Sequence, residues 1–194
     1  MKKILLFSVF ASFSFALLQA QDDFVEKAKN GGFYVGANIG LPLSTSSDMT
    51  SFNFGFDGAY LFEVIDNLEI GGLLGYTHFV ADGAYTYKAW NDAVYAVNFK
   101  DASFIPVAAS ARYYFAEHKF FGGLDLGLAI NLAGDAKTGF YARPKFGYNL
   151  GTISLIASFQ SVSGGVDYGD AYYGGSYSTT RGFSSFNFGV EYGF

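Results

Sequence analysis

The chain has 194 residues, of which 51% are hydrophobic, 20% are aromatic and only 15% are charged, with a formal net charge of −5 at pH 7. A soluble domain usually carries about 25% charged residues, so this composition is unusual for a surface that faces water. The acidic balance argues against nucleic acid as a partner, because no basic field is present to neutralise phosphates. The sequence contains no Cys, which excludes disulfides, thiolate metal sites and a cysteine nucleophile.

The amino terminus has the pattern of a secretory signal peptide. Lys2 and Lys3 precede an apolar run over residues 4–18, and Ala20 offers a small residue for cleavage. The run is short for a membrane-spanning helix and acidic residues follow it at once, which disfavours a membrane anchor. We therefore predict three parts: a signal peptide over residues 1–20, a short periplasmic segment over 21–31, and one β-barrel domain over 32–194.

Eight runs of two-residue alternation follow the leader. In each run every second residue is mostly bulky and apolar, and the residues between are mostly Gly, Ala, Ser, Asn or isolated charges, as in a strand with one apolar and one polar face. The runs cover residues 34–41, 52–63, 68–80, 105–115, 120–131, 140–150, 153–160 and 186–194. Their lengths are close to the roughly 9 to 11 residues that a tilted strand needs to cross a bilayer.

The connections between the runs are long and short by turns. The connections after the first, third, fifth and seventh runs are long, above all residues 81–102 and 164–181, whereas the others are tight turns. This asymmetry is typical of a membrane barrel with short periplasmic turns and longer surface loops. A β-sandwich or a soluble barrel has no reason to segregate its loops in this way.

The chemistry of the two faces predicts which one points outward. An eight-stranded barrel has an interior that side chains fill, so the small polar face suits the lumen and the Phe-rich face suits lipid. The predicted fold is therefore an all-β, eight-stranded, antiparallel transmembrane barrel with up-and-down topology. A lipocalin-like soluble barrel, with the pattern reversed, is the structural alternative. Five residues break the alternation: Leu73, Phe104, Tyr114 and Ile156 fall on the polar side and Pro144 on the apolar side.

The final run ends the chain on an aromatic residue. Its apolar side consists of Phe186, Phe188, Val190, Tyr192 and Phe194. We expect Tyr192 and Phe194 at the periplasmic membrane interface, with Glu191 pointing into the lumen near its lower mouth.

These segments are similar to a known family. The stretch Phe104-Ile105-Pro106-Val107, followed by Arg112-Tyr113-Tyr114-Phe115, resembles a segment of the PorT-like outer-membrane β-barrel family of Gram-negative bacteria. Residues 186–194 resemble the carboxy-terminal signal that the barrel-assembly machinery recognises. The resemblance implies that machinery as a partner and localisation in the outer membrane of a Gram-negative bacterium. The leader predicts export, the Phe-rich face predicts outer-membrane lipid as a partner, and a monomer is expected by default. It carries no catalytic residues over, because the family shares none.

Inward-facing charges are the first candidates for function. They are Asp57, Glu63, Glu69, Arg112, Asp125, Arg143, Lys145 and Glu191. Asp125 is expected at the height of Arg143 and Lys145, so a buried ion network is predicted there. Such a network is either a gate in a narrow ion path or a polar core whose charges are paired because unpaired burial is costly.

The two longest loops are the second candidate. Their aromatic residues are Tyr85, Tyr87, Trp90, Tyr95, Tyr168, Tyr172, Tyr173 and Tyr177. Aromatic and small polar residues on surface loops suit recognition of a protein or glycan, although strand pairs that merely extend above the membrane would look the same. Asp167 and Asp170 are too few for a calcium site, and no cofactor or metal is predicted.

Catalysis has little support in the sequence. His78 and His118 are the only histidines, and alternation places His78 on the lipid face near the outer rim. An outer-membrane lipid acyltransferase would need a general base there, beside a serine and a carboxylate. We predict no enzyme, and a structural or surface-interaction role in envelope integrity, adhesion or service to a larger assembly. A small passive, porin-like channel is the alternative, and the acyltransferase is third.

Overall fold

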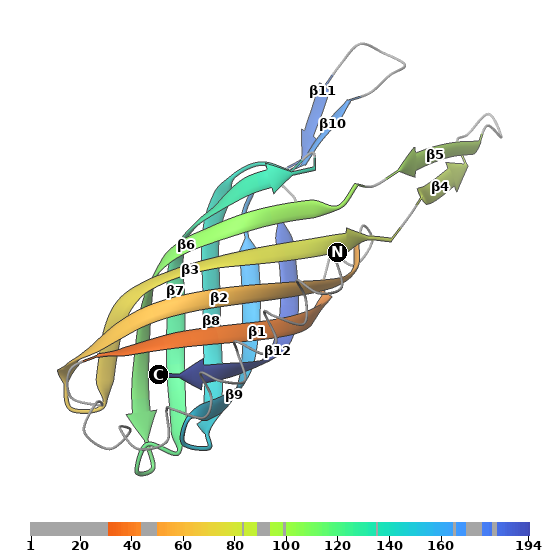
Figure 1. Ribbon diagram of the computed structural model, residues 1–194. Coiled ribbons are helices and arrows are strands. Elements are labelled where there is room, and N and C mark those ends of the chain that lie inside the picture. Colours follow the sequence, from red (N-terminus) through yellow and green to blue (C-terminus); the bar gives the residue numbers. More distant parts are fainter. Residues whose placement is uncertain are drawn as a thin grey trace, which may run out of the picture.

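The computed structural model is a closed antiparallel β-barrel, as the alternation predicts (Figure 1). It describes residues 31–43, 50–82, 84–88, 94–98, 100–134, 136–164, 166–169, 176–179 and 182–194. The predicted signal peptide and nearly all of the predicted periplasmic segment lie outside these residues. Among the described residues, no helix is long and apolar enough to cross a membrane.

Eight strands form the barrel wall, in the order β1-β12-β9-β8-β7-β6-β3-β2, and β2 closes on β1. Each pairs antiparallel with both neighbours, which gives the predicted up-and-down topology. The wall strands are β1 (Gly32–Pro42), β2 (Thr50–Ile65), β3 (Leu68–Ala81), β6 (Ala102–Phe115), β7 (Phe120–Ala133), β8 (Gly139–Asn149), β9 (Ile153–Val162) and β12 (Phe183–Gly193). Because the sheet closes on itself, every wall strand has a partner on both sides, the condition for placing strands in a bilayer.

The two ends of the barrel differ as the loop lengths predict. Tight turns join β2 to β3, β6 to β7 and β8 to β9. Asn67 has a φ of 68° in the first of these turns, and Gly151 has a φ of 101° in the third. Both residue types tolerate this left-handed backbone.

At the opposite end, two of the connections contain strand pairs of their own. These are β4 (Ala84–Lys88) with β5 (Val94–Asn98), and β10 (Val166–Gly169) with β11 (Ser176–Thr179). Figure 1 shows both hairpins projecting beyond the barrel from that end. The two aromatic loops predicted from the sequence therefore each contain a separate two-stranded sheet.

The outer face of the wall is apolar. Ile39 and Phe188 lie opposite each other on β1 and β12 and are 68% and 62% exposed. The same outward face carries Phe56 on β2, Leu74 on β3 and Phe140 on β8, all more than half exposed. A continuous apolar surface of this kind is far larger than a soluble monomer leaves in water, and it fits the hydrocarbon region of a bilayer. The reversed pattern of a soluble lipocalin-like barrel is absent from the described wall.

Most residues that break the apolar and polar alternation still point to the side that their position in the strand requires. Leu73, Phe104 and Tyr114 are buried in the lumen, as their parity requires, and Pro144 is exposed on the outer face. Phe104 helps to close the lumen, and Tyr114 lies at its opposite mouth, so these two bulky inward residues belong to the packing of the interior.

Candidate functional site

The lumen contains the charged residues, and glycine on neighbouring strands makes room for them. Gly36 lies opposite both Asp57 on β2 and Glu191 on β12. Gly123 on β7 lies opposite both Arg112 on β6 and Lys145 on β8. Long inward side chains therefore extend over neighbours that have none, which is how a narrow barrel accommodates them.

One ion pair crosses the half of the lumen that lies nearer to the tight turns. Arg112 on β6 and Glu191 on β12 lie on opposite walls of the eight-strand ring. Arg112 Nη1 donates to Glu191 Oε1 at 2.6 Å, and Nη2 donates to Oε2. The guanidinium carbon lies 4.5 Å from the ring centre of Tyr34 and 5.0 Å from that of Phe121. Both charged residues are at most 3% exposed, so the pair is fully removed from water.

A second cluster crosses the lumen between β2, β7 and β8. Arg143 Nη1 donates to Asp57 Oδ2 at 2.8 Å, and Arg143 Nε donates to Asp125 Oδ2 at 2.8 Å. Lys145 Nζ donates to Asp125 Oδ1 at 2.7 Å and lies 3.3 Å from Ser110 Oγ. Two carboxylates face two cations, so the cluster is neutral. β2 and β8 are opposite walls, and this contact again connects the two sides.

The structure thus divides the predicted charge network in two and leaves two of its members out. Glu63 and Glu69 lie opposite each other on β2 and β3, at the mouth with the tight turns, and neither meets a cation among the described residues. Glu63 Oε1 accepts a bond from the backbone N–H of Asn67, and Glu69 accepts bonds from the hydroxyls of Tyr34 and Tyr114. The prediction placed them in the network because alternation gives the direction of a side chain but not its reach.

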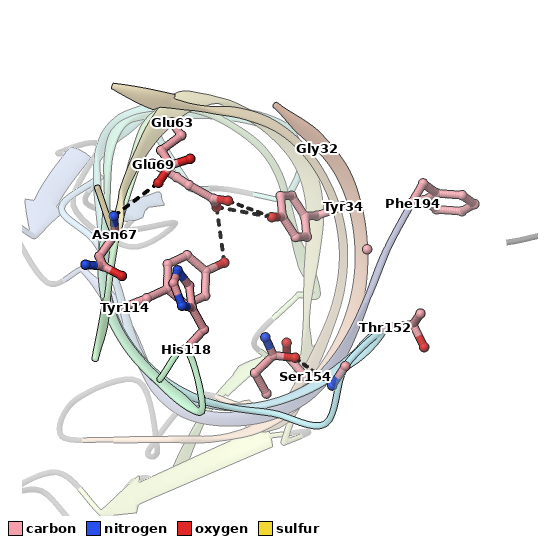
Figure 2. Close-up of a pocket in the computed structure, with 13 residues that line it drawn as sticks. Gly32, Tyr34, Glu63, Asn67, Glu69, Tyr114, His118, Thr152, Ser154 and Phe194 are labelled. Atoms are coloured by element: carbon pink, nitrogen blue, oxygen red, sulfur yellow. Dashed lines mark hydrogen bonds between the residues drawn. The ribbon is translucent and has the colours of Figure 1, made fainter. Parts of the chain in front are cut away.

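These mouth residues line a cavity of about 250 Å³ (Figure 2). Figure 2 shows Glu69 pointing inward between Tyr34 and Tyr114, whereas Phe194 points away from the barrel. Beyond the cavity, the buried side chains of the two charge clusters cross the lumen. The small space beside Asp57 and Arg143 measures about 20 Å³, room for about one water.

A neutral polar layer lies between the charged clusters and the end of the barrel that carries the hairpins. Asn53 Nδ2 donates to Asn187 Oδ1 at 2.7 Å, over Gly40, which lies between them on β1. Asn187 Nδ2 also donates to Ser185 Oγ at 3.0 Å. Gln160 is 1% exposed and lies opposite Ser185 on the neighbouring strand.

Three aromatic rings close the lumen at the end that carries the hairpins. Phe79, Phe104 and Phe183 come from β3, β6 and β12, and their ring centres lie 5.0 to 6.2 Å apart. Phe79 and Phe104 are fully buried, and Phe183 is 4% exposed. The sequence prediction missed this aromatic cap. The available signal was parity, because Phe79 and Phe183 both fall on the polar side of their strands.

The residues of the proposed assembly signal lie outward on β12. Phe186, Phe188 and Val190 are exposed. At the mouth, the rings of Tyr192 and Phe194 meet at 4.7 Å, and Phe194 also lies 5.8 Å from Phe33. The backbone N–H of Phe194 donates to the carbonyl of Phe33, which ties the last residue to β1.

The loop tyrosines can be placed only in part. Tyr87 lies opposite Tyr95 in the β4–β5 pair, and Tyr168 lies opposite Tyr177 in the β10–β11 pair. Tyr85 lies on β4. Trp90, Tyr172, Tyr173 and Asp170 lie outside the described residues. Within the part of the chain that the structure describes, no group of three or more His, Asp or Glu could hold a metal ion.

Fold and surface define a class. A closed eight-stranded wall with an apolar exterior and an interior crossed by buried ion pairs is a transmembrane β-barrel of the outer-membrane type.

No family model matches the chain, and no curated protein matches its sequence. Solved structures with a similar fold include two that cover most of this chain. One is a de novo designed transmembrane β-barrel, 12% identical, with a TM-score of 0.49 over 86% of this chain and 98% of the other. The second is Neisserial surface protein A, 18% identical, with a TM-score of 0.49 over 84% of this chain and 97% of the other.

Proposed function

We propose that this protein is a non-conducting outer-membrane barrel with a structural or surface-interaction role. The observation that carries the proposal is the closure of the lumen at successive levels. Arg112 with Glu191, Arg143 with Asp57, and the cap formed by Phe79, Phe104 and Phe183 each join opposite or distant walls. With the interior occupied in this way, the barrel has its outer surface and its two hairpins to act with.

The charge pattern favours the structural interpretation of the lumen over the channel. A conducting path needs sites that ions enter and leave, lined by charges that are accessible to water. Here Asp125 and Lys145 bind each other at 2.7 Å and are buried, so neither is available to a passing ion. The neutral clusters act as cross-braces between strands.

The hairpins supply the interaction surface in this proposal. β4–β5 and β10–β11 extend past the wall at the end away from the tight turns (Figure 1), which would be the cell surface in an outer-membrane barrel. The proposed partner is an extracellular or envelope protein. The barrel-assembly machinery and the outer-membrane lipid are partners in biogenesis, the chain is exported by its leader, and the barrel is a monomer. We also propose that the chain is a member of the PorT-like family.

Two experiments test this function. The first is single-channel recording of the purified barrel in a planar bilayer, where we expect no steady conductance steps; regular steps would contradict the closed lumen. The second is crosslinking on intact cells from a photoreactive residue at position 87 or 168, with position 117 in a tight turn as the matched control. A discrete protein adduct from the hairpins alone supports the interaction role. Its absence would restrict the role to the envelope structure.

A further inference from the structure

The outward face of the barrel carries a polar cluster at the end with the hairpins. His78 lies near the end of β3, and Ser103 lies opposite it at the start of β6. Side chains that are directly opposite on antiparallel strands have Cβ atoms roughly 4.5 to 5.5 Å apart, so the register itself brings these two into reach. His78 Nδ1 lies 2.8 Å from Ser103 Oγ. The other ring nitrogen, Nε2, lies 3.3 Å from Asp101 Oδ2.

The hydrogen bonds define a direction for the proton. Asp101 is held in place because its Oδ1 accepts the backbone N–H of Ala81 at 2.9 Å. A carboxylate only accepts, so the neutral imidazole places its proton on Nε2 and leaves Nδ1 to accept from the hydroxyl of Ser103. The order of contacts is that of a serine–histidine–carboxylate triad, with Nδ1 facing the serine and Nε2 facing the carboxylate, the reverse of the usual assignment of the two nitrogens. Such a triad is recognised by geometry, whatever the order of its residues in the chain.

We propose that Ser103, His78 and Asp101 form a site for the hydrolysis of acyl esters of membrane lipid. Ser103 is the nucleophile, His78 is the general base, and Asp101 is a positioning residue. The site goes beyond the structural role proposed above, and it takes from it only the assignment of this rim to the outer leaflet.

The position of the cluster determines the class of substrate. His78 and Tyr76 project from the same outward face of β3, and the ring of Phe54 on β2 lies 5.2 Å from that of His78. The aromatic row continues along β2, where Phe52 and Phe56 lie on either side of Phe54 at 6.5 and 6.3 Å. An acyl chain lying along this row would present its ester near the rim, where Asp101 is 53% exposed at its side chain.

Tyr76 covers the nucleophile and completes the site. Its hydroxyl lies 3.2 Å from Ser103 Oγ and 3.3 Å from His78 Nδ1, and Ser103 is only 5% exposed beneath the two rings. A carbonyl oxygen that enters between Tyr76 and Ser103 would take over the hydroxyl as a hydrogen-bond donor. A tyrosine hydroxyl in that place stabilises the negative charge that develops on the oxygen.

The reaction balances with water as the second substrate. Ser103 Oγ attacks the ester carbonyl while its proton passes to His78 Nδ1. The tetrahedral intermediate then expels the alcohol, which takes up that proton, and an acyl ester of Ser103 remains. Water attacks this ester with His78 again as the base, and the fatty acid leaves as the serine hydroxyl is restored.

The same hydrogen bonds would also stabilise the pairing of β3 with β6. The test therefore needs a readout that a purely structural role would not give. The full chain is folded into phosphatidylcholine vesicles and treated with a long-chain fluorophosphonate, and the adduct is located by peptide mass spectrometry. Release of fatty acid from the vesicles is measured in parallel. We expect one adduct, on Ser103, and its complete loss in Ser103→Ala. In His78→Ala, labelling and fatty-acid release should fall by about 100-fold or more.

Matched controls separate the site from its surroundings. Ser161→Ala removes an outward serine near the same end of β9, and His118→Ala removes the other histidine, in a tight turn; both should react like the unaltered protein. Heat-modifiable mobility on a gel reports whether each variant has folded. Because the adduct is mapped on the unaltered chain, the test does not depend on any variant folding. No adduct at Ser103 together with no fatty-acid release above empty vesicles overturns the proposal.

Discussion

Arg112 and Glu191 form a doubly hydrogen-bonded ion pair between opposite walls of the barrel, with Nη1 and Oε1 2.6 Å apart. Because both residues are buried, the pair stabilises the contact between the two walls only while both partners are present. Removing one partner leaves a charge without compensation in a closed lumen, which is much more costly than removing both.

The first prediction concerns this pair. Glu191→Ala should lower the free energy of unfolding by about 3–5 kcal/mol, because the Arg112 guanidinium stays buried without its carboxylate. The double variant Arg112→Met with Glu191→Leu should recover most of the loss. Urea unfolding in lipid vesicles measures both. Glu117→Ala is the control, since its contact with Lys119 is exposed, at 3.8 Å, and should change stability by about 0–1 kcal/mol. Equal losses in Glu191→Ala and in the control would contradict the proposed brace.

The second prediction concerns the aromatic cap. Phe104→Ala should destabilise the barrel by about 3–5 kcal/mol, because the cavity it leaves between Phe79 and Phe183 is enclosed by protein. Phe188→Ala removes a ring of the same size from the outer face, where lipid chains can fill the space, and should cost clearly less. The comparison uses the same urea unfolding. A cost for Phe188→Ala equal to that for Phe104→Ala would show that the outer face is packed against something more ordered than lipid.

The third prediction concerns inward glycine. A Cβ on Gly147 would collide with the ring of Phe121, which lies opposite it on β7. Gly147→Ala should therefore destabilise the barrel by about 1–3 kcal/mol, as overpacking does elsewhere. Gly72 on β3 is the control, because a Cβ there meets no atom within 4 Å. Gly72→Ala should leave the folded fraction on a heat-modifiability gel unchanged, and a loss as large as that of Gly147→Ala would count against the steric explanation.

The fourth prediction concerns assembly. Deleting Phe194 removes the ring that packs on Phe33 and Tyr192, together with the last backbone hydrogen bond to β1. We expect much less barrel in outer-membrane fractions, measured by immunoblotting. Phe115→Ala is the comparison, because it removes a ring at the same tight-turn end that stacks on Phe120 at 6.0 Å but lies on another strand. Normal abundance of the deletion would count against residues 186–194 as an assembly signal.

Two-residue alternation predicted the direction of most side chains, and it did so because a strand places successive residues on opposite faces whatever its surroundings. Leu73 and Phe104 show how far this reaches: parity places both in the lumen although both are apolar, and both are buried there. Loop length predicted which end carries the hairpins. The fold and the apolar exterior followed from the same two local signals.

Contacts across the barrel depended on the tertiary structure. That Arg112 meets Glu191 and not Glu69, its neighbour across the β3–β6 pair, follows from ring closure and strand stagger, which combine all eight registers at once. The aromatic cap has the same origin, whereas the opposition of His78 and Ser103 depends only on the register of the neighbouring strands β3 and β6. Local sequence determined the face on which each of these side chains lies. The closed sheet decided which of them meet, because register between distant strands is a property of the whole ring.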